Sequence, residues 1–282
     1  MTIRTWKLSS EPPPSELIEL PLAGCASLDE ASSLLPGGAY TTFRTFERSK
    51  AVRLSNHFHR LEETAALAGQ SIRLDTAGLR QALRQVISQQ KSGDELRLRL
   101  TLDLEQQPGT FYISAQPLET PPPDAYQQGA RVITTRLERM LPKAKLTRFI
   151  VRSSSVRQDL GAGINEAIMI DARERLLEGI SSNFFAILEK KIRTAEEGVL
   201  SGITRSVVLA AADNLGIQTI FEPVTLADIP ALDEAFITSS SRGILPVRQI
   251  DQVTIGPECP GPVTRLLMDE YSLRLGEQLE EI

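Results

Sequence analysis

The 282-residue sequence is poor in cysteine and histidine, and this scarcity excludes several kinds of site. Its two cysteines, Cys25 and Cys259, lie far apart, so we expect no disulfide scaffold and favour a reducing cytoplasm as the location. The two histidines, His57 and His59, are near neighbours, and with two distant cysteines they form no credible ligand set for a metal. We therefore expect neither a structural disulfide nor a metal cofactor.

Long apolar runs and clusters of basic residues are also missing. No apolar stretch reaches the roughly 18 residues that a membrane-spanning helix needs, and the start of the chain has no apolar segment typical of a signal peptide. The formal net charge of −5, without a long run of lysine or arginine, gives no footprint for nucleic acid. With 41% hydrophobic and 24% charged residues, the chain has the composition of a globular protein with a full core.

A proline-rich segment over residues 119–129, ETPPPDAYQQG, predicts an extended linker between two domains. We place an N-terminal α/β domain at residues 1–118 and a C-terminal α/β domain, which contains Lys145, at residues 130–282. In the first domain, leucines alternate strictly through residues 95–104, which predicts a half-buried strand in a hairpin with residues 109–118. The domain's other predicted elements are a strand at 41–49 and helices at 56–70 and 75–90.

The second domain has the same mixture of elements. Strands are predicted at residues 130–138 and 233–241, and a series of short strands and turns at 166–195. Helices are predicted at residues 147–158 and 201–216, followed by an amphipathic helix from Pro260. Antiparallel strands with peripheral helices indicate the α+β class.

Four segments carry residues suited to chemistry, and each has an ordinary alternative. SGITR, at 201–205, begins a helix whose first N–H groups can seat a phosphate, or it is a plain N-cap. TSSSRG, at 238–243, offers hydroxyls and amides for a second phosphate or substrate contact, or it is a plain turn. Glu178 can keep a heterocycle nitrogen protonated, or it is a solvated turn residue. Lys143 and Lys145 precede a helix. Burial and cationic neighbours lower the pKa of a lysine and suit it to form a Schiff base; the alternative is that both lysines lie on the surface.

The order and spelling of these segments resemble the class IV aminotransferases, a family that includes branched-chain aminotransferases, D-amino-acid aminotransferases and 4-amino-4-deoxychorismate lyase. The strongest segments are EGISSNFF, IRT and VLSGITR, and the residues that meet the family signature are Glu178, Asn183, Phe184, Phe185, Thr194, Gly202, Ile203 and Arg205. The resemblance implies a two-domain fold-type IV enzyme, like D-amino-acid aminotransferase, with pyridoxal 5'-phosphate (PLP) at the domain interface. It also implies a homodimer.

The resemblance implies that Lys145 holds the cofactor as a Schiff base. In the lyase and D-amino-acid branches, this lysine stands 21 residues before the glutamate that opens a short apolar strand. Here Glu166 opens EAIMID, and 166 − 145 = 21, whereas Lys143 gives 166 − 143 = 23. Once the substrate amine has released it, Lys145 is expected to act as general base and acid at the substrate α-carbon.

The resemblance assigns the remaining roles. Glu178 faces the pyridine nitrogen, and the expected phosphate ligands are Arg60, Ile203, Thr204, Ser240 and Ser241, the last two also near the substrate. Tyr40 matches a strand residue that lines the substrate pocket. His57 is expected to be a structural hydrogen-bonding residue and His59 a surface residue.

The sequence departs from the family pattern at several points, and these leave the reaction open. The loop over residues 195–199 is one residue shorter than usual and begins with Ala195 in place of proline. Ile150 replaces the tyrosine of branched-chain enzymes, and residues 104–110 lack the Arg-x-His carboxylate trap of D-amino-acid enzymes. Transamination between an amino acid and a 2-oxo acid, and elimination of pyruvate from aminodeoxychorismate, are both expected readings. The alternative is a non-catalytic homologue that binds PLP or another phosphate.

Overall fold

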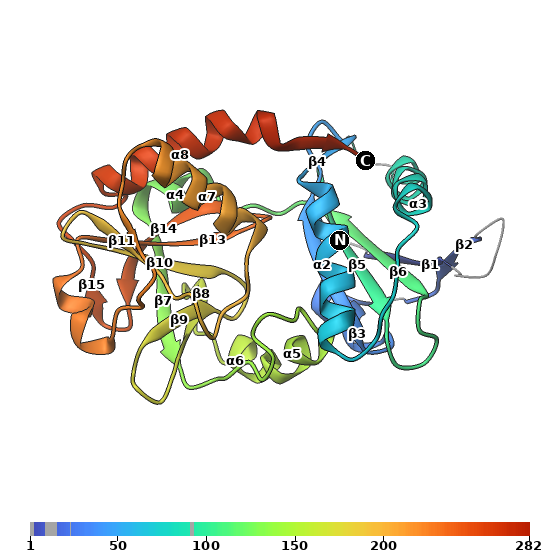
Figure 1. Ribbon diagram of the computed structural model, residues 1–282, viewed down its shortest axis with the longest axis horizontal. Helices are drawn as coiled ribbons and strands as arrows, with labels where there is room; N and C mark the ends of the chain where they lie inside the picture. The colour runs from blue at the N-terminus through green and yellow to red at the C-terminus, as the bar shows by residue number, and fades with distance from the viewer. Residues whose placement is uncertain (1–2, 9–15, 23, 91–92) are drawn as a thin grey trace. The chain divides into compact units, whose positions relative to one another are not determined.

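The computed structural model of the chain describes residues 3–8, 16–22, 24–90 and 93–282. The chain divides into two compact units (Figure 1). Unit 1 consists of Met1–Glu119, Ala144–Arg152 and Gln278–Ile282. Unit 2 consists of Thr120–Lys143 and Ser153–Glu277.

Unit 1 is built on a five-stranded antiparallel sheet in the order β2-β1-β6-β5-β3. Its strands are β1 (Arg4–Leu8), β2 (Leu17–Leu20), β3 (Gly38–Arg44), β5 (Leu96–Asp103) and β6 (Phe111–Pro117). Helix α2 (Leu54–Leu67) lies across β3, and α3 (Thr76–Ser88) packs near β6 (Figure 1). The core between helices and sheet includes Trp6, Phe43 and Phe58.

Strand β5 is buried on both faces, so the expectation of a half-buried strand is wrong. Its leucines enter the core as their alternation predicts. On the other face Arg99 is only 4% exposed, because its guanidinium donates to Leu28 O and Ser32 Oγ of α1 (Leu28–Ser33) at 2.9 and 2.8 Å. The strand therefore follows the pattern of a sheet covered on two sides.

Residues 144–152 belong to unit 1, which corrects the expectation of one domain over residues 130–282. The backbone N–H of Tyr40 in edge strand β3 donates to Lys145 O at 2.9 Å. Ala144 and Leu146 join the core of unit 1, and α5 (Thr147–Arg152) follows. Gln278–Ile282 also belongs to this unit, because β16 (Leu279–Glu281), which was not expected, pairs with β4 (Lys50–Val52).

Unit 2 contains a nine-stranded sheet that runs β12-β11-β10-β13-β14-β7-β8-β9, with β15 beside β14. The strands are β7 (Ala130–Thr135), β8 (Glu166–Ile170), β9 (Leu176–Gly179), β10 (Asn183–Leu188), β11 (Lys191–Arg193), β12 (Thr219–Ile220), β13 (Glu234–Ser239), β14 (Gly243–Ile250) and β15 (Val253–Thr254). A further pairing of β9 with β10, at Glu178 and Asn183, closes the strands from β10 to β9 into a ring. Apolar residues fill both faces: Phe184 lies in one core, and Phe185 stacks on Phe236 in the other.

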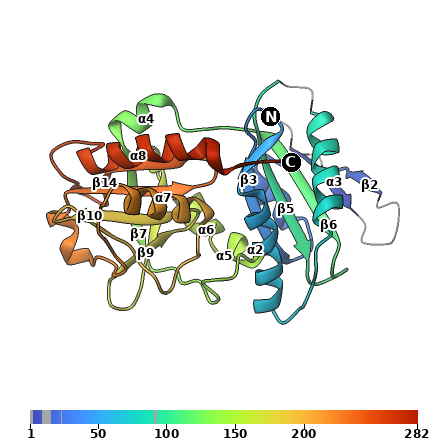
Figure 2. The same cartoon turned by 45° about the horizontal axis from the view of Figure 1, so that its top comes forward.

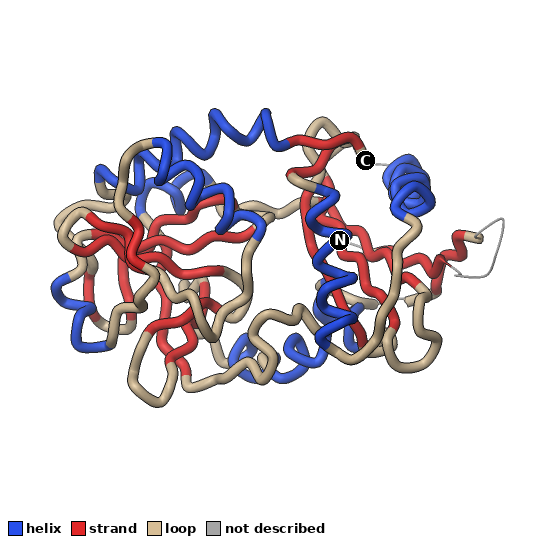
Figure 3. The backbone as a smooth tube through the Cα atoms, in the orientation of Figure 1, coloured by secondary structure: helices blue, strands red, loops and turns tan. Residues whose placement is uncertain are grey.

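Helices α7 (Ile203–Asn214) and α8 (Pro262–Leu275) pack against each other and against β13 (Figures 1 and 2). They cover the core that contains Phe185 and Phe236, and Figure 3 shows these helices in blue over the red strands of unit 2. Short 3-10 turns occur at Leu226–Ala231 and Gly276–Gln278. The packing of α7 against α8 and β13 fixes the start of α7 above the strands that carry Asn183 and Thr238.

Two expected elements of the middle of the chain differ in the structure. The proline-rich segment is not wholly extended, because α4 (Pro123–Gln128) forms there with proline in its first turn, where a missing N–H is no loss. The helix expected over residues 147–158 is interrupted at Ser153, whose φ of −90° and ψ of 0° leave the helical region, so that α5 and α6 (Ser154–Gln158) result. Among the described residues, no helix has both the length and the apolar character to cross a membrane.

Candidate functional site

Lys145 lies beside Tyr40 in unit 1. The lysine Nζ is 4.7 Å from the centroid of the Tyr40 ring, and the lysine backbone N–H donates to Thr64 Oγ1 of α2 at 3.2 Å. The guanidinium carbon of Arg99 is 4.9 Å from the same ring centroid. Two cations therefore contact one aromatic ring, an arrangement that cation–π attraction favours.

His57 and Arg60 lie one turn apart on α2, close to Lys145. His57 is 1% exposed, and its Nδ1 is 2.6 Å from Thr41 Oγ1. Burial, and then the positive charges of Arg60 and Lys145, hold the pKa of His57 well below 6.5. His57 is therefore a neutral residue held by a hydrogen bond, and both cationic site candidates of unit 1 act on its charge. His59 is exposed beside two glutamates of the same helix.

Glu178 is the most strongly fixed candidate in unit 2. It is 2% exposed, and Arg139 Nε donates to its Oε1 at 3.0 Å. Its Oε2 accepts from Asn183 Nδ2 at 3.2 Å and from the backbone N–H of Leu200 at 3.0 Å. A buried carboxylate without a cationic partner is costly, and the Arg139 guanidinium, whose side chain is also buried, supplies that partner.

The start of helix α7 approaches Asn183 closely. Ile203 and Thr204 are the first two helical residues and both are buried. Gly202 precedes them and offers no side-chain cap. A Cβ at Gly202 would overlap Asn183 Oδ1, so only glycine lets the helix start this near to the residue that binds Glu178. The positive end of the helix dipole thus lies near the fixed carboxylate.

Ser240 and Ser241 lie half-buried in the three-residue turn between β13 and β14. Gly243 closes this turn with a φ of +65°, as expected for a hairpin loop of this length. Two residues before Ser240, Thr238 pairs directly with Asn183, so the two side chains share one face of the sheet. The Thr238 hydroxyl oxygen is buried and has no hydrogen-bond partner among the described residues.

Arg139 and Thr238 were not among the residues predicted from the sequence. The ion pair of Arg139 with Glu178 joins residues 39 positions apart, so no local spacing announces it. A general signal was present, since a glutamate expected to stay charged in a pocket requires a cation nearby. Thr238 stood inside the TSSSRG segment but was passed over for the serines. No group of three or more histidines, cysteines or acidic residues in the described part of the chain is placed to hold a metal ion.

The structure therefore brings the predicted residues together within each unit. Unit 1 places Lys145 beside Tyr40 and against α2, the helix that carries Arg60, whereas Lys143 is an exposed residue of unit 2. Unit 2 joins the Glu178 carboxylate to the start of α7 through Asn183. The turn with Ser240 and Ser241 follows the strand that pairs with Asn183.

Comparison with known proteins gives consistent matches. The family model "Amino-transferase class IV" matches residues 38–250, more than half of the chain. The branched-chain-amino-acid aminotransferase of Pseudomonas aeruginosa is 31% identical over 52% of this chain, and the match spans only 50% of that relative. The solved structure of 4-amino-4-deoxychorismate lyase from Pseudomonas aeruginosa is 25% identical with a TM-score of 0.71, covering 96% of this chain and 98% of its own.

A further solved structure, the branched-chain aminotransferase from the thermophilic archaeon Thermoproteus uzoniensis with norvaline, is similar at the level of the fold. It has a TM-score of 0.76 at 23% identity and covers 99% of this chain and 98% of its own. The expected α+β, fold-type IV class is confirmed by these neighbours. With the family model matching residues 38–250, the chain belongs to the class IV aminotransferase family.

Proposed function

We propose that this chain is a PLP-dependent enzyme that acts at the α-carbon and amino group of an amino-acid substrate, with Lys145 as the attachment point of the cofactor. The buried carboxylate of Glu178, fixed by Arg139, Asn183 and the Leu200 N–H, is the observation that carries the proposal. A carboxylate held in this way is suited to keep a proton on a pyridine nitrogen. Membership of the class IV aminotransferases supports the same cofactor.

The residues of unit 2 fit the cofactor at two of its ends. Glu178 suits the ring nitrogen, and the start of α7, without a side-chain cap, suits a phosphate dianion. The Thr238 hydroxyl on the same face of the sheet is buried without a hydrogen bond among the described residues, and a phosphate or bound water would supply the missing partner. In unit 1, Arg60 adds a guanidinium suited to a phosphate.

When bound, PLP supplies an aldehyde that condenses with amines and a protonated ring that takes up electron density from the α-carbon. The chain's own part is to hold and move protons. Glu178 holds the proton at the ring nitrogen, and Arg139 keeps that carboxylate charged. The Lys145 amine removes the proton from the substrate α-carbon and returns it. Ile203 and Thr204 N–H groups, with Arg60, Ser240 and Ser241, would bind the phosphate, and Tyr40 would line the substrate side.

Two reactions remain for this site, and a different observation favours each. Transamination is supported by the branched-chain relative at 31% identity. Elimination of pyruvate from aminodeoxychorismate is supported by the lyase structure, which is similar over nearly the whole chain. Ile150, buried where branched-chain enzymes have a tyrosine, also favours the lyase. Both reactions begin with proton removal by Lys145 and differ in the product.

A pair of assays on the PLP-loaded protein decides between these reactions. A transaminase converts one L-amino acid per site to its 2-oxo acid without an acceptor, and it turns over repeatedly only when a second 2-oxo acid is supplied to take the amino group. A lyase releases pyruvate from aminodeoxychorismate without any acceptor. Lys145→Ala and Lys143→Ala serve as matched variants, and only the first is expected to lose either activity. Retention of PLP with neither product would refute the enzyme proposal in favour of the non-catalytic homologue.

We also propose a homodimer and a cytoplasmic location for this enzyme. Family membership supports the dimer, and two free cysteines, Cys25 and Cys259, support a reducing compartment. Light scattering of the purified protein tests the dimer: a mass near 62 kDa is expected, twice the 31.0 kDa of one chain. A mass of one chain at assay concentration would refute it.

A further inference from the structure

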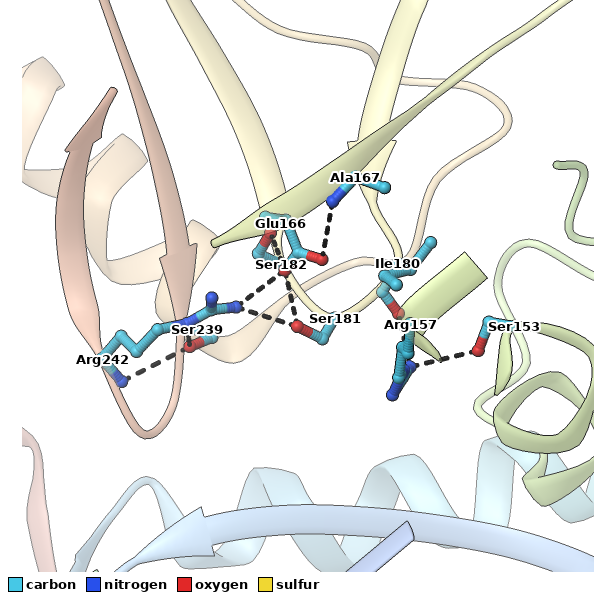
Figure 4. Close-up of polar contacts among 9 residues, drawn as sticks. All are labelled: Ser153, Arg157, Glu166, Ala167, Ile180, Ser181, Ser182, Ser239 and Arg242. Carbon is cyan, nitrogen blue, oxygen red and sulfur yellow. Dashed lines mark hydrogen bonds and ion pairs between the residues drawn. The ribbon is translucent and has the colours of Figure 1, made fainter. Parts of the chain in front are cut away.

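Glu166, the first residue of β8, is buried and gathers polar groups from two turns (Figure 4). Its Oε2 accepts from Ser181 Oγ at 2.6 Å, from Ser182 Oγ at 3.0 Å and from Arg242 Nη2 at 2.9 Å. Ser181 and Ser182 lie in the turn between Glu178 and Asn183. Glu166 thus ties the segment that carries the fixed carboxylate to the turn that carries Arg242.

Arg242 holds the other end of this network. Besides Glu166, its Nη2 donates to Ser181 Oγ at 2.9 Å, and its Nε donates to Ser239 Oγ at 3.1 Å. The backbone O of Arg242 accepts from Tyr126 Oη of α4 at 2.9 Å. Figure 4 shows the Arg242 side chain reaching from the β13–β14 turn toward Glu166 and Ser181. Ser239, the last residue of β13, and Arg242, the last residue of the three-residue turn, are therefore both fixed by side-chain hydrogen bonds.

We propose that Glu166 and Arg242 are positioning residues that hold Ser240 and Ser241 in place for the cofactor phosphate. The inference rests on the proposed PLP function. Ser240 and Ser241 lie between these two fixed residues, so their hydroxyls and amides are placed by the network rather than by the hairpin alone. Placing binding groups in advance avoids the entropic cost of ordering a loop when the ligand binds.

Charge and packing favour this role over direct contact of Arg242 with an anionic substrate. The Arg242 guanidinium is already paired with a carboxylate that is 2% exposed, so its charge is largely compensated. The Glu166 side chain also lies against Gly179, where a Cβ would come within 2.9 Å of Glu166 Cγ. The network is thus built into the packing next to Glu178, and a change at Arg242 is expected to act on the turn.

The test compares the binding of PLP with that of pyridoxal, which lacks the phosphate. Dissociation constants are measured on the full-length, cofactor-free protein by absorbance titration. Arg242→Lys is expected to loosen the turn so that one hydrogen bond from Ser240 or Ser241 to the charged phosphate is lost. This should weaken PLP binding by at least about tenfold and change pyridoxal binding much less. Glu178→Gln should weaken both alike. Arg175→Lys is the matched control, because Arg175 pairs with Asp171 at 2.6 Å at the opposite end of β8.

The decisive quantity is the dissociation constant of pyridoxal divided by that of PLP, which measures the preference for PLP. If Arg242→Lys and Glu166→Gln keep the wild-type ratio, the positioning role is wrong although the PLP function stands. If the wild-type protein shows no preference for PLP, both proposals fail. The double variant Glu166→Gln/Arg242→Lys should lower the ratio little beyond the single variants, since the two residues act as one unit. Additive losses would contradict a shared role.

A milder variant, Ser239→Ala, tests the inference in a protein that is expected to fold normally. Ser239→Ala removes the acceptor of Arg242 Nε and leaves the buried ion pair with Glu166 intact. Thermal unfolding of the cofactor-free variant should match the wild type to within a few degrees, while the PLP-to-pyridoxal preference falls severalfold. An unchanged preference in this folded variant would also contradict the inference.

Discussion

Replacing Arg139 by glutamine removes a cation that is paired with the buried Glu178 carboxylate. The structure contains a matched pair for comparison, because Arg136 and Glu174 lie 3.1 Å apart on the surface, against 3.0 Å for Arg139 and Glu178. The distances are alike, but the side chains are 63% and 56% exposed in the first pair and 6% and 2% exposed in the second. The two pairs therefore differ chiefly in burial.

Breaking a buried pair by removing one partner costs about 3–5 kcal/mol, whereas an exposed pair contributes roughly 0–1 kcal/mol. Because Asn183 and the Leu200 N–H still bind Glu178, we expect Arg139→Gln to lower the free energy of unfolding by about 3 kcal/mol. Arg136→Gln should lower it by less than about 1 kcal/mol.

Urea unfolding of the cofactor-free protein, followed by circular dichroism at neutral pH, measures both losses. The double variant Arg139→Gln/Glu178→Gln should be more stable than Arg139→Gln alone, because it removes the buried carboxylate charge together with its ion-pair partner. Equal losses for Arg139→Gln and Arg136→Gln would refute the reasoning. So would a double variant whose loss equals the sum of the single losses.

Three further predictions follow from single groups. Burial holds the pKa of His57 well below 6.5, so near that pH the unfolded chain binds a proton at His57 and the folded chain does not. The free energy of unfolding therefore decreases as the pH falls below about 6.5. Between pH 7.5 and 5.5 wild type should lose about 1.4 kcal/mol more than His57→Gln in urea unfolding, and parallel profiles would contradict this. Burial raises the pKa of Cys259 to about 11, so about one thiol in a thousand is ionised at pH 8. Iodoacetamide should therefore alkylate Cys259 slowly at pH 8, and the alkylation rate should rise about tenfold for each pH unit above that. Fast labelling at pH 8 would contradict the burial of this thiol. Gly202→Ala should lower the unfolding free energy by about 1–3 kcal/mol, since its Cβ overlaps Asn183 Oδ1, whereas Gly276→Ala, with open space around it, is the neutral control.

Local patterns predicted much of each unit, because the period of apolar residues follows directly from strand and helix geometry. The leucines of β5 and the helix that begins at Ile203 are examples. The second covered face of β5 was missed, since Arg99 is charged and its burial depends on acceptors in α1, far away in sequence. The helix α4 was missed because three prolines suggest an extended chain, although proline is well accommodated at a helix start.

Lys145 shows where spacing helps and where it does not. Counting from Glu166 selected this lysine over Lys143, and the structure separates the two, with Lys143 exposed in unit 2 and Lys145 at the edge of β3 in unit 1. No pattern in the sequence indicates that a short segment after β7 pairs with a strand about a hundred residues earlier. Long-range pairing depends on the whole fold, which is also why Arg139 was missed as the partner of Glu178.

The central claim is that Lys145 holds the cofactor. Reduction of the PLP-loaded protein with borohydride fixes the cofactor to its lysine, and peptide mass spectrometry then locates the phosphopyridoxyl group. The label is expected on Lys145 in the wild type and to disappear in Lys145→Ala. A label on Lys143, or a specific label that survives Lys145→Ala, would contradict the account.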